Sequence, residues 1–282
     1  MIEWNTVRTP FDESTFLISG SSDDRSVVEA VRSGNGCWEP HVMHVMHRYL
    51  QADHTCFDIG ANLGIHTLVM SKLTPQGSVF AFESSRQNFD FLVRNIEING
   101  SRNVSPYQFA LWNANGRVKL NFVRELAGCA FVLDDNSLGT GLEKIRAVVT
   151  ADWAQTSEIH VSEEEVDCVR LDDWAAQTGV KGLGLIKLDV EGAEIPVLQG
   201  AEKLIARFQP LLITEYNPAC AVKYFGASET AYYDLLSDVF PFRYLIQDGG
   251  HLTRLDCRET LLEALQRGKG WEDLLCSFHS LA

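Results

Sequence analysis

The stretch Thr-Cys-Phe-Asp-Ile-Gly-Ala-Asn-Leu-Gly, residues 55–64, decides the fold of this chain. Residues 55–59 are mostly apolar or β-branched, as in a buried strand, and the glycines at 60 and 64 indicate a tight turn. After the turn, apolar residues recur at the spacing of a helix until Pro-Gln-Gly at 75–77 ends it. The stretch is therefore the strand–turn–helix unit from which α/β sheets are built.

The same unit repeats along the chain. A second strand is expected at 78–83, and Ser84 and Ser85 can cap the helix that follows and ends at 99–100. Further buried strands are expected at 104–111, 183–188 and 211–216, and one helix between the last two. This alternation predicts a doubly wound, mostly parallel α/β sheet of the Rossmann-like type with helices on both faces.

The remaining segments interrupt or flank the alternation. One or two helices at 23–50 predict an N-terminal helical cap over residues 1–50 that covers the ligand cleft. The core is expected at 51–257, with an insertion at 124–165 whose flanks, 118–122 and 166–169, can pair as an antiparallel hairpin. A hairpin at 242–254 and a helix from about residue 259 lead into an expected C-terminal helical extension, 258–282.

The amino-acid composition and net charge disfavour some classes of binding partner. The 38 acidic and 24 basic residues give a net charge of −14, which disfavours nucleic acid as a substrate. Seven cysteines without CxxC or Cys/His zinc spacing indicate reduced thiols. No stretch approaches 18 apolar residues and no basic signal region opens the chain, so we expect no membrane span and a cytoplasmic location. The oligomeric state stays open, with a homodimer as one option.

The turn at 60–64 and Glu83 together suit a nucleoside ligand. Glycines at 60 and 64 allow close approach of the backbone, and a carboxylate at the end of the second strand can accept both ribose hydroxyl protons. NAD would fit such a site, but the middle glycine of a dinucleotide turn is absent. The added acid, Asp58, fits the ammonium group of S-adenosylmethionine, which carries no phosphate.

Over roughly residues 36–217 the chain resembles the FkbM-type methyltransferases of the class I fold. The resemblance rests on the motifs at 57–67, 82–83, 110–111, 171–173, 186–194 and 197–201, together with Asn95, Asn99, Pro210 and Glu215. It implies S-adenosylmethionine as cofactor, with Asp58 and the 60–64 turn beside its methionine part and Glu83 on its ribose. Ser84 departs from the proline that the family usually has there. The full set of cofactor residues that we expect is Glu39, Asp58, Gly60, Asn62, Gly64, Thr67, Glu83, Ser84, Phe109 and Ala110. Of these, Phe109 and Ala110 would border the adenine, and Thr67 would contact the cofactor's carboxylate or its own helix backbone.

A second cluster, Lys187-x-Asp189-x-Glu191-x-x-Glu194, follows a central strand, where α/β enzymes place their active sites. Three interpretations stay open: Asp189 or Glu191 is the general base; Asp189, Glu191 and Glu215 hold Mg²⁺; or Lys187 pairs with an acid in a structural network. A catalytic role for Lys187 is also open.

Three histidines, His41, His44 and His47, share one expected helix and are interpreted as surface or cleft-lining residues, with His41 and His66 as further alternatives for the base.

The function that we predict is O-methylation of a hydroxyl on a small-molecule natural product, sugar or glycolipid. The N-terminal helices and the 124–165 insertion would form the acceptor pocket. The alternatives are an NAD-linked oxidoreductase on the same kind of sheet and a non-catalytic methyltransferase-like binding module.

Overall fold

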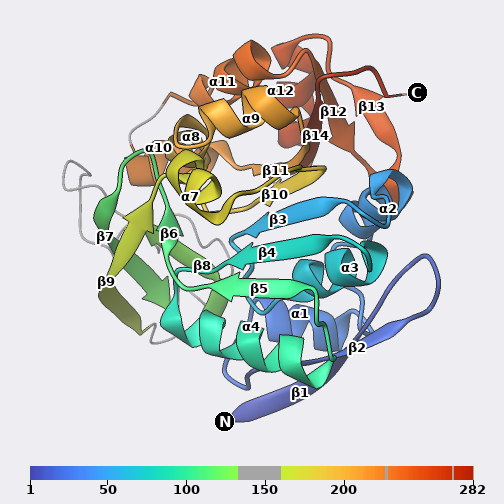
Figure 1. Cartoon of the computed structure of the whole chain (residues 1–282), viewed down its shortest axis with the longest axis vertical. Helices are drawn as coiled ribbons and strands as arrows, with labels where there is room; N and C mark the ends of the chain where they lie inside the picture. The colour runs from blue at the N-terminus through green and yellow to red at the C-terminus, as the bar shows by residue number, and fades with distance from the viewer. Residues whose placement is uncertain (133–159, 226–227, 269, 282) are drawn as a thin grey trace.

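Eight strands form the central sheet in the computed structural model, which describes residues 1–132, 160–225, 228–268 and 270–281 (Figure 1). They are β3 (Thr55–Ile59), β4 (Ser78–Phe82), β5 (Val104–Tyr107), β10 (Leu185–Leu188), β11 (Leu211–Tyr216), β12 (Phe242–Ile246), β13 (Leu252–Arg254) and β14 (Glu272–Ser277). Their order is β13-β12-β14-β11-β10-β3-β4-β5, and only β14 and β13 run against the others. The predicted doubly wound, mostly parallel sheet is confirmed.

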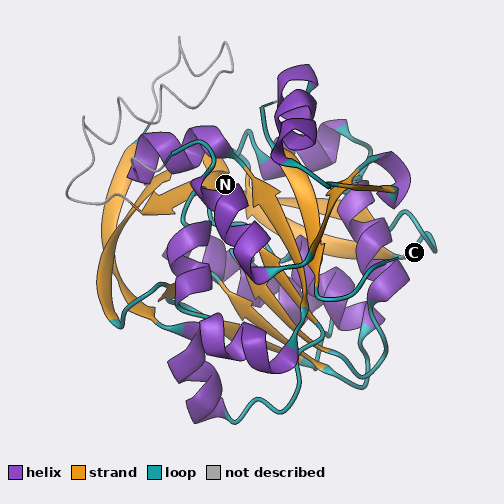
Figure 2. Ribbon diagram, turned by 90° about the horizontal axis from the view of Figure 1, so that it is seen from above, coloured by secondary structure: helices purple, strands orange, loops and turns teal. Residues whose placement is uncertain are grey.

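Helices cover both faces of this sheet, as Figure 2 shows. One face carries α1 (Val27–Ser33), α2 (Pro40–Tyr49), α3 (Ile65–Leu73) and α4 (Arg86–Ile98). The other carries α7 (Leu171–Thr178), α8 (Glu194–Gln199), α9 (Glu202–Phe208), α11 (Ala231–Val239) and α12 (Arg258–Arg267). Two further elements, α10 (Pro218–Phe225) and the 3-10 helix η1 (Asp248–Gly250), lie in loops. In the described part of the chain, no helix is both long and apolar enough to cross a membrane.

Alternation along the strands builds the two cores. Cys56 of β3 and Leu185 of β10 pack with α2 and α3, whereas the next residues, Phe57 and Ile186, pack with the helices of the opposite face. All four side chains are at most 1% exposed. Because both faces of the sheet are covered, both sides of these strands are buried and apolar residues dominate them; Asp58 and Lys187, near the carboxyl ends, are the charged exceptions.

The chain begins with a hairpin, so the prediction of a purely helical cap over residues 1–50 is wrong for its first part. β1 (Ile2–Arg8) and β2 (Thr15–Ser21) pair antiparallel, with Val7 opposite Phe16. Val7, Phe16 and Ile18 are buried with a period of two, the pattern of a strand. One or two helices are expected at 23–50, and the structure has two, α1 and α2.

The described part of the insertion and the segments that flank it form a second sheet, which lies at the left of Figure 1. It contains β6 (Ala110–Leu111), β7 (Gly116–Val123), β8 (Leu126–Val132) and β9 (Val161–Val169), in the order β6-β9-β7-β8. Val118 of β7 pairs with Val166 of β9, which confirms the hairpin predicted from the flanks. The single strand expected at 104–111 is divided between the two sheets as β5 and β6. Residues 133–159 of the insertion lie outside the described part.

Two predictions for the second half of the chain are corrected. The one helix expected after 188 is two, α8 and α9, which are separated at Gly200 and Ala201. Gly200 lies against the backbone of Trp112, where a Cβ would come within 2.1 Å of the carbonyl oxygen. The extension 258–282 is helical only in α12. Its end, β14, inserts between β11 and β12 with Leu274, Leu275 and Cys276 fully buried, since both faces of the sheet are covered there. The hairpin predicted at 242–254 is confirmed as β12 and β13.

Asn95 ties the N-terminal hairpin to the turn that follows β3. This fully buried side chain of α4 accepts hydrogen bonds from the Ser19 backbone N–H (2.7 Å) and hydroxyl (2.8 Å). Its amide donates to the carbonyl oxygens of Ser19 (3.0 Å) and Leu63 (2.8 Å). One turn later, Asn99 exchanges two hydrogen bonds with the backbone of Leu17. The two asparagines therefore act as a hydrogen-bonding partner for β2.

Replacing Asn95 with alanine is expected to lower the free energy of unfolding by about 3 kcal/mol, because buried polar groups of Ser19 and Leu63 then lose their hydrogen-bond partner. Asn99→Ala, at a half-buried position, is the matched control and should cost about 1 kcal/mol. Urea unfolding followed by circular dichroism measures both values. Equal losses for the two variants would contradict the role given to Asn95.

Candidate active site

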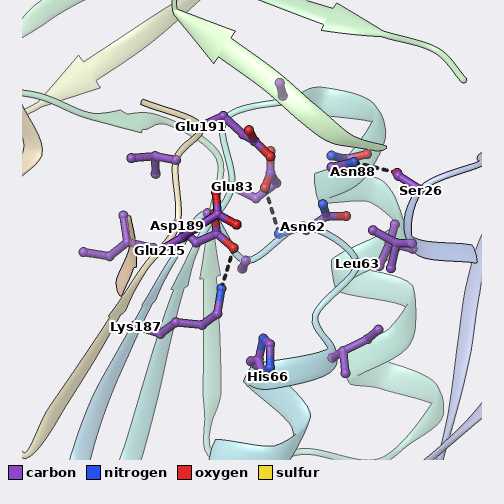
Figure 3. Close-up of a pocket in the computed structure, with 18 of the residues that line it drawn as sticks. Ser26, Asn62, Leu63, His66, Glu83, Asn88, Lys187, Asp189, Glu191 and Glu215 are labelled. Atoms are coloured by element: carbon purple, nitrogen blue, oxygen red, sulfur yellow. Dashed lines mark hydrogen bonds and ion pairs between the residues drawn. The ribbon is translucent and has the colours of Figure 1, made fainter. Parts of the chain in front are cut away.

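A cavity of about 870 Å³ opens at the carboxyl ends of the parallel strands. It lies where the strand order reverses, since β3 has β4 on one side and β10 on the other. In open α/β sheets this is the position at which ligands bind. Its walls come from the 59–66 turn, the segments after β4, β10 and β11, helices α1 and α2, and the second sheet. Figure 3 shows its interior.

The turn after β3 depends on two glycines with left-handed backbones. At Gly60 (φ +79°) a Cβ would come within 1.8 Å of the carbonyl oxygen of Asp189, so only glycine lets the end of β3 lie against the segment after β10. At Gly64 (φ +88°) a Cβ would come within 2.6 Å of Leu92 on α4. The first glycine closes the floor of the cavity, and the second allows α3 and α4 to pack closely.

Glu83 follows β4, and its carboxylate faces the cavity (Figure 3). Its two oxygens accept backbone N–H hydrogen bonds, one from Asn62 (2.8 Å) and one from Ser85 (2.8 Å). Burial raises the pKa of Glu83 to about 7, although these two hydrogen bonds offset part of the effect. A carboxylate oxygen has two acceptor positions, so each oxygen keeps one for a ligand hydroxyl.

The other predicted cofactor residues fall into two groups. Glu39, Gly60, Asn62, Ser84, Phe109 and Ala110 line the cavity with Glu83. Asp58, Gly64 and Thr67 are not part of its wall. The Thr67 hydroxyl donates to Asp58 and not to its own helix backbone, and its expected contact with the cofactor stays a prediction. The second oxygen of Asp58 is buried and has no hydrogen-bond partner among the described residues.

Asp58 belongs to a row of ionisable side chains that crosses four neighbouring strands. The row consists of Asp58 on β3, Lys187 on β10, Glu215 on β11 and Asp273 on β14. Each lies two residues from a buried apolar residue of the α2–α3 face, so the row is the polar edge of that core. Asp58 is opposite Lys187, and Glu215 is opposite Asp273. Like charges directly opposite are unfavourable, so this part of the row needs protons or cations.

Lys187 is the positive charge of the row. Its ammonium group lies 2.9 Å from Asp189 (Figure 3). Burial acts to lower the pKa of Lys187, but the charges of Asp189, Glu39 and Asp58 together raise it above its ordinary range. Lys187 therefore stays protonated and acts as a counter-ion, not as a proton acceptor.

Of the remaining acids of the 187–194 cluster, Glu194 has a structural position and Glu191 lines the cavity. Glu194 accepts from the backbone N–H groups of Val190 (3.1 Å) and Gly192 (3.2 Å), which fixes the start of α8. Together with the Lys187–Asp189 pair, this is the structural network among the three interpretations. Glu191 lines the cavity on a left-handed backbone (φ +53°), and burial and the charge of Asp189 raise its pKa well above the ordinary value.

The magnesium interpretation is not supported. Among the described residues, no group of three or more histidine, cysteine, aspartate or glutamate side chains is arranged to hold a metal ion. This includes Asp189, Glu191 and Glu215, although all three line the cavity. Asp189 instead bonds to Lys187, and Glu215 accepts from the side-chain amide of Asn217.

Two histidines enter the site from the covering helices. His41 of α2 lines the cavity, and its Nε2 lies 2.7 Å from Asp273. His66 at the start of α3 is buried, with Nε2 3.4 Å from Glu39. Burial lowers the pKa of His66 and raises that of Glu39 to about 8, the latter with the help of Asp273. The sequence did not reveal Asp273, because its segment was expected to be helical. Of the other two α2 histidines, neither lines the cavity, and His47 stacks on Phe11.

The chain matches the family described as Methyltransferase FkbM domain over residues 58–233. It is 30% identical over 156 residues to Methyltransferase 1 of Beauveria bassiana, covering 53% of this chain and 59% of that protein. It is 30% identical over 157 residues to Methyltransferase sdnD of Sordaria araneosa, covering 52% and 60%. The matched part thus spans about three fifths of the length of these two relatives.

A third relative, the 2-O-methyltransferase NoeI of Sinorhizobium fredii, is 24% identical over 222 residues, covering 71% of this chain and 78% of that protein. Among solved structures, a methyltransferase FkbM from Methylobacillus flagellatus superposes with a TM-score of 0.46 at 14% identity, covering 80% of this chain and 44% of that one.

The buried acids predict an unusual dependence of stability on pH. Glu83, Glu194 and Glu39 lose their protons near pH 7 to 8 when folded but near 4.5 when unfolded. Between these values the folded protein holds more protons, so its free energy of unfolding falls as the pH rises. The ligand-free protein should lose about 1–3 kcal/mol from about pH 6.5 to about pH 8. His66, with its lowered pKa, opposes this trend only at the acid end.

Urea unfolding at several pH values measures this slope. Glu39→Gln removes one of the three acids and should flatten the slope, whereas Glu165→Gln, at an exposed position beside Arg117, should leave it unchanged. A wild-type stability that stays constant or rises over this interval would contradict the assigned burial of charge.

Proposed function

This chain belongs to the FkbM methyltransferase family, and we propose that it transfers a methyl group from S-adenosylmethionine to a hydroxyl of a small-molecule natural product, sugar or glycolipid. Three observations support the proposal: the carboxylate of Glu83, the shape and lining of the cavity, and the relatives named above.

Glu83 is the observation that carries the proposal. It follows β4 and lines the cavity, and hydrogen bonds from the backbone N–H groups of Asn62 and Ser85 hold its carboxylate in one orientation. A fixed carboxylate with one free acceptor position on each oxygen matches the two vicinal hydroxyls of a ribose. A nucleoside bound there would place its base toward Phe109 and Ala110, which line the same wall. The ring of Phe109 is held against that of Phe82, with centroids 5.7 Å apart.

A ribose bound at Glu83 would have an acidic surface on the side away from the base. Glu39, Asp189 and Glu191 line the cavity beyond the turn, and Asp58 lies buried close by. Among the described residues of this wall, Lys187 supplies one positive charge, so carboxylates outnumber cations. A ligand with a cationic amino-acid part would restore the balance, which favours S-adenosylmethionine over NAD with its two phosphates.

S-adenosylmethionine supplies a methyl group activated by its sulfonium, and transfer to a neutral hydroxyl oxygen leaves a proton that a base must take up. Residues of the segments after β10 and β11, Asp248 of η1 and Trp271 also line the cavity, and this part would receive the acceptor. Apolar residues of α1 and of the second sheet, including Val27 and Leu120, line a further part and suit an acceptor with an apolar portion.

Glu83→Gln is expected to raise the Kd for S-adenosylmethionine about 10- to 100-fold, because the amide offers one acceptor oxygen in place of two. Isothermal titration calorimetry measures the affinity in the absence of any acceptor. Glu165→Gln is the matched control, since Glu165 is exposed and does not line the cavity. Unchanged affinity in the Glu83 variant would contradict the ribose assignment.

The same titration with NAD decides between the two cofactors, and tighter binding of NAD would support the oxidoreductase. Methyl transfer itself is followed with labelled S-adenosylmethionine and a panel of hydroxyl acceptors, namely methyl glucoside, N-acetylglucosamine, octyl glucoside and 4-nitrophenol. Cofactor binding without transfer to any of them would favour a non-catalytic binding module.

A further inference from the structure

His41 and Asp273 form a histidine–carboxylate pair on the side of the cavity away from Glu83. Nε2 of His41 lies 2.7 Å from Oδ2 of Asp273. Asp273 is on β14, four strands from β4, which corresponds to roughly 19 Å across the sheet at the usual strand spacing. The ribose carboxylate and this pair therefore lie at opposite ends of the site, with the segments after β3 and β10 between them.

The carboxylate determines which nitrogen of His41 is basic. Asp273 is 7% exposed, does not itself line the cavity and lies across from Glu215 on the paired strand, so the surrounding packing restricts its side chain. An ionised carboxylate only accepts hydrogen bonds, so Nε2 of His41 carries the hydrogen, and the lone pair of the neutral imidazole is on Nδ1. A histidine oriented in this way is a typical general base in enzymes.

The carboxylates near His41 are less suited than its imidazole to accept the proton of the acceptor hydroxyl. Asp189 is already neutralised by Lys187 at 2.9 Å. Glu215 faces Asp273 directly, and burial with the neighbouring charges raises its pKa well above the ordinary value, as for Glu191. His66 lines the cavity too, but its ring lies against the carboxyl of Glu39, and burial lowers its pKa.

We propose that His41 is the general base of the transfer reaction and that Asp273 is its positioning residue; this rests on the proposed function. The O–H proton of the acceptor passes to Nδ1 of His41 while the oxygen forms its bond to the methyl carbon. The bond between methyl carbon and sulfur breaks, and its electron pair stays on the sulfur. The products are the methyl ether, S-adenosylhomocysteine and an imidazolium that the Asp273 carboxylate stabilises.

The pair can be tested without an acceptor. In nitrogen-labelled protein saturated with S-adenosylhomocysteine, the NMR chemical shifts of the two ring nitrogens report which one carries the hydrogen, and His41→Gln identifies the His41 signals. In the neutral imidazole of the wild type the hydrogen should lie on Nε2, and Asp273→Ala should remove this preference, because it removes the acceptor of the hydrogen bond. The other groups around His41 are Glu39 and His44 on its own helix, His66 of α3, Lys187, Glu215 and Asp248 of η1, and all are unchanged in this variant. Equal ring-nitrogen shifts of His41 in the two proteins would overturn the pair.

The role as base is tested with two acceptors that differ in their need for one. Trifluoroethanol must lose its proton during attack, whereas 4-nitrophenol is largely ionised in a neutral or slightly alkaline buffer. His41→Gln keeps a group that can hydrogen bond to Asp273, and it should slow transfer to trifluoroethanol about 10²- to 10⁴-fold. Transfer to 4-nitrophenol should stay within about threefold of wild type, because no base is needed.

His47→Gln is the matched control on the same helix, since His47 stacks on Phe11 away from the cavity, and it should behave as wild type. Calorimetry should show the same affinity for S-adenosylmethionine in all variants. Equal losses with both acceptors, or no loss with either, would overturn the assignment of His41. Failure of the wild-type protein to bind S-adenosylmethionine would instead overturn the proposed function.

Discussion

The carboxylate of Glu83 accepts two hydrogen bonds, one from a backbone N–H group in each of two loops. The arrangement of the site depends on these two hydrogen bonds. Asn62 belongs to the turn after β3, and Ser85 precedes α4, so Glu83 fixes the two loops relative to each other. The close contact of Gly60 with the backbone of Asp189 joins the segment after β10 to the same frame. Three neighbouring strand ends are thereby held rigidly around one cavity before any ligand binds, which lowers the cost of ordering a ligand there.

The buried charges of the site are the second constraint on its structure. The sheet edge buries Asp58, Glu215 and Asp273 with Lys187, and the loops above add Glu39, Asp189 and Glu191. In the ligand-free protein this excess of carboxylates is relieved by raised pKa values, that is, by bound protons. A cationic ligand relieves it in another way, by allowing the acids to ionise. Stability without ligand and affinity for a cationic cofactor are therefore two consequences of the same buried charge.

The sequence predicted the parts of this protein that depend on local patterns. The strand–turn–helix units around 55–64 and 78–98, and the hairpins formed by β7 with β9 and by β12 with β13, follow from periodicity and turn residues. It could not predict β14, because the apolar run of this segment is only three residues long, 274–276, and is compatible with a helix or a strand until the neighbouring strands are known. Asp273 was missed for that reason. Asp58 lies opposite Lys187 and accepts a hydrogen bond from Thr67, contacts that depend on strand pairing and packing; its expected place at the ligand stays a prediction.

The central claim is that the Glu83 carboxylate accepts hydrogen bonds from the ribose hydroxyls of a sulfonium nucleoside. A crystal structure of the wild-type protein with S-adenosylhomocysteine, whose nucleoside is the same, tests it most directly. The account predicts both ribose hydroxyls within hydrogen-bonding distance of the Glu83 oxygens, with the Asn62 and Ser85 N–H bonds retained. A nucleoside bound elsewhere, or a ribose that makes no contact with Glu83, would contradict it.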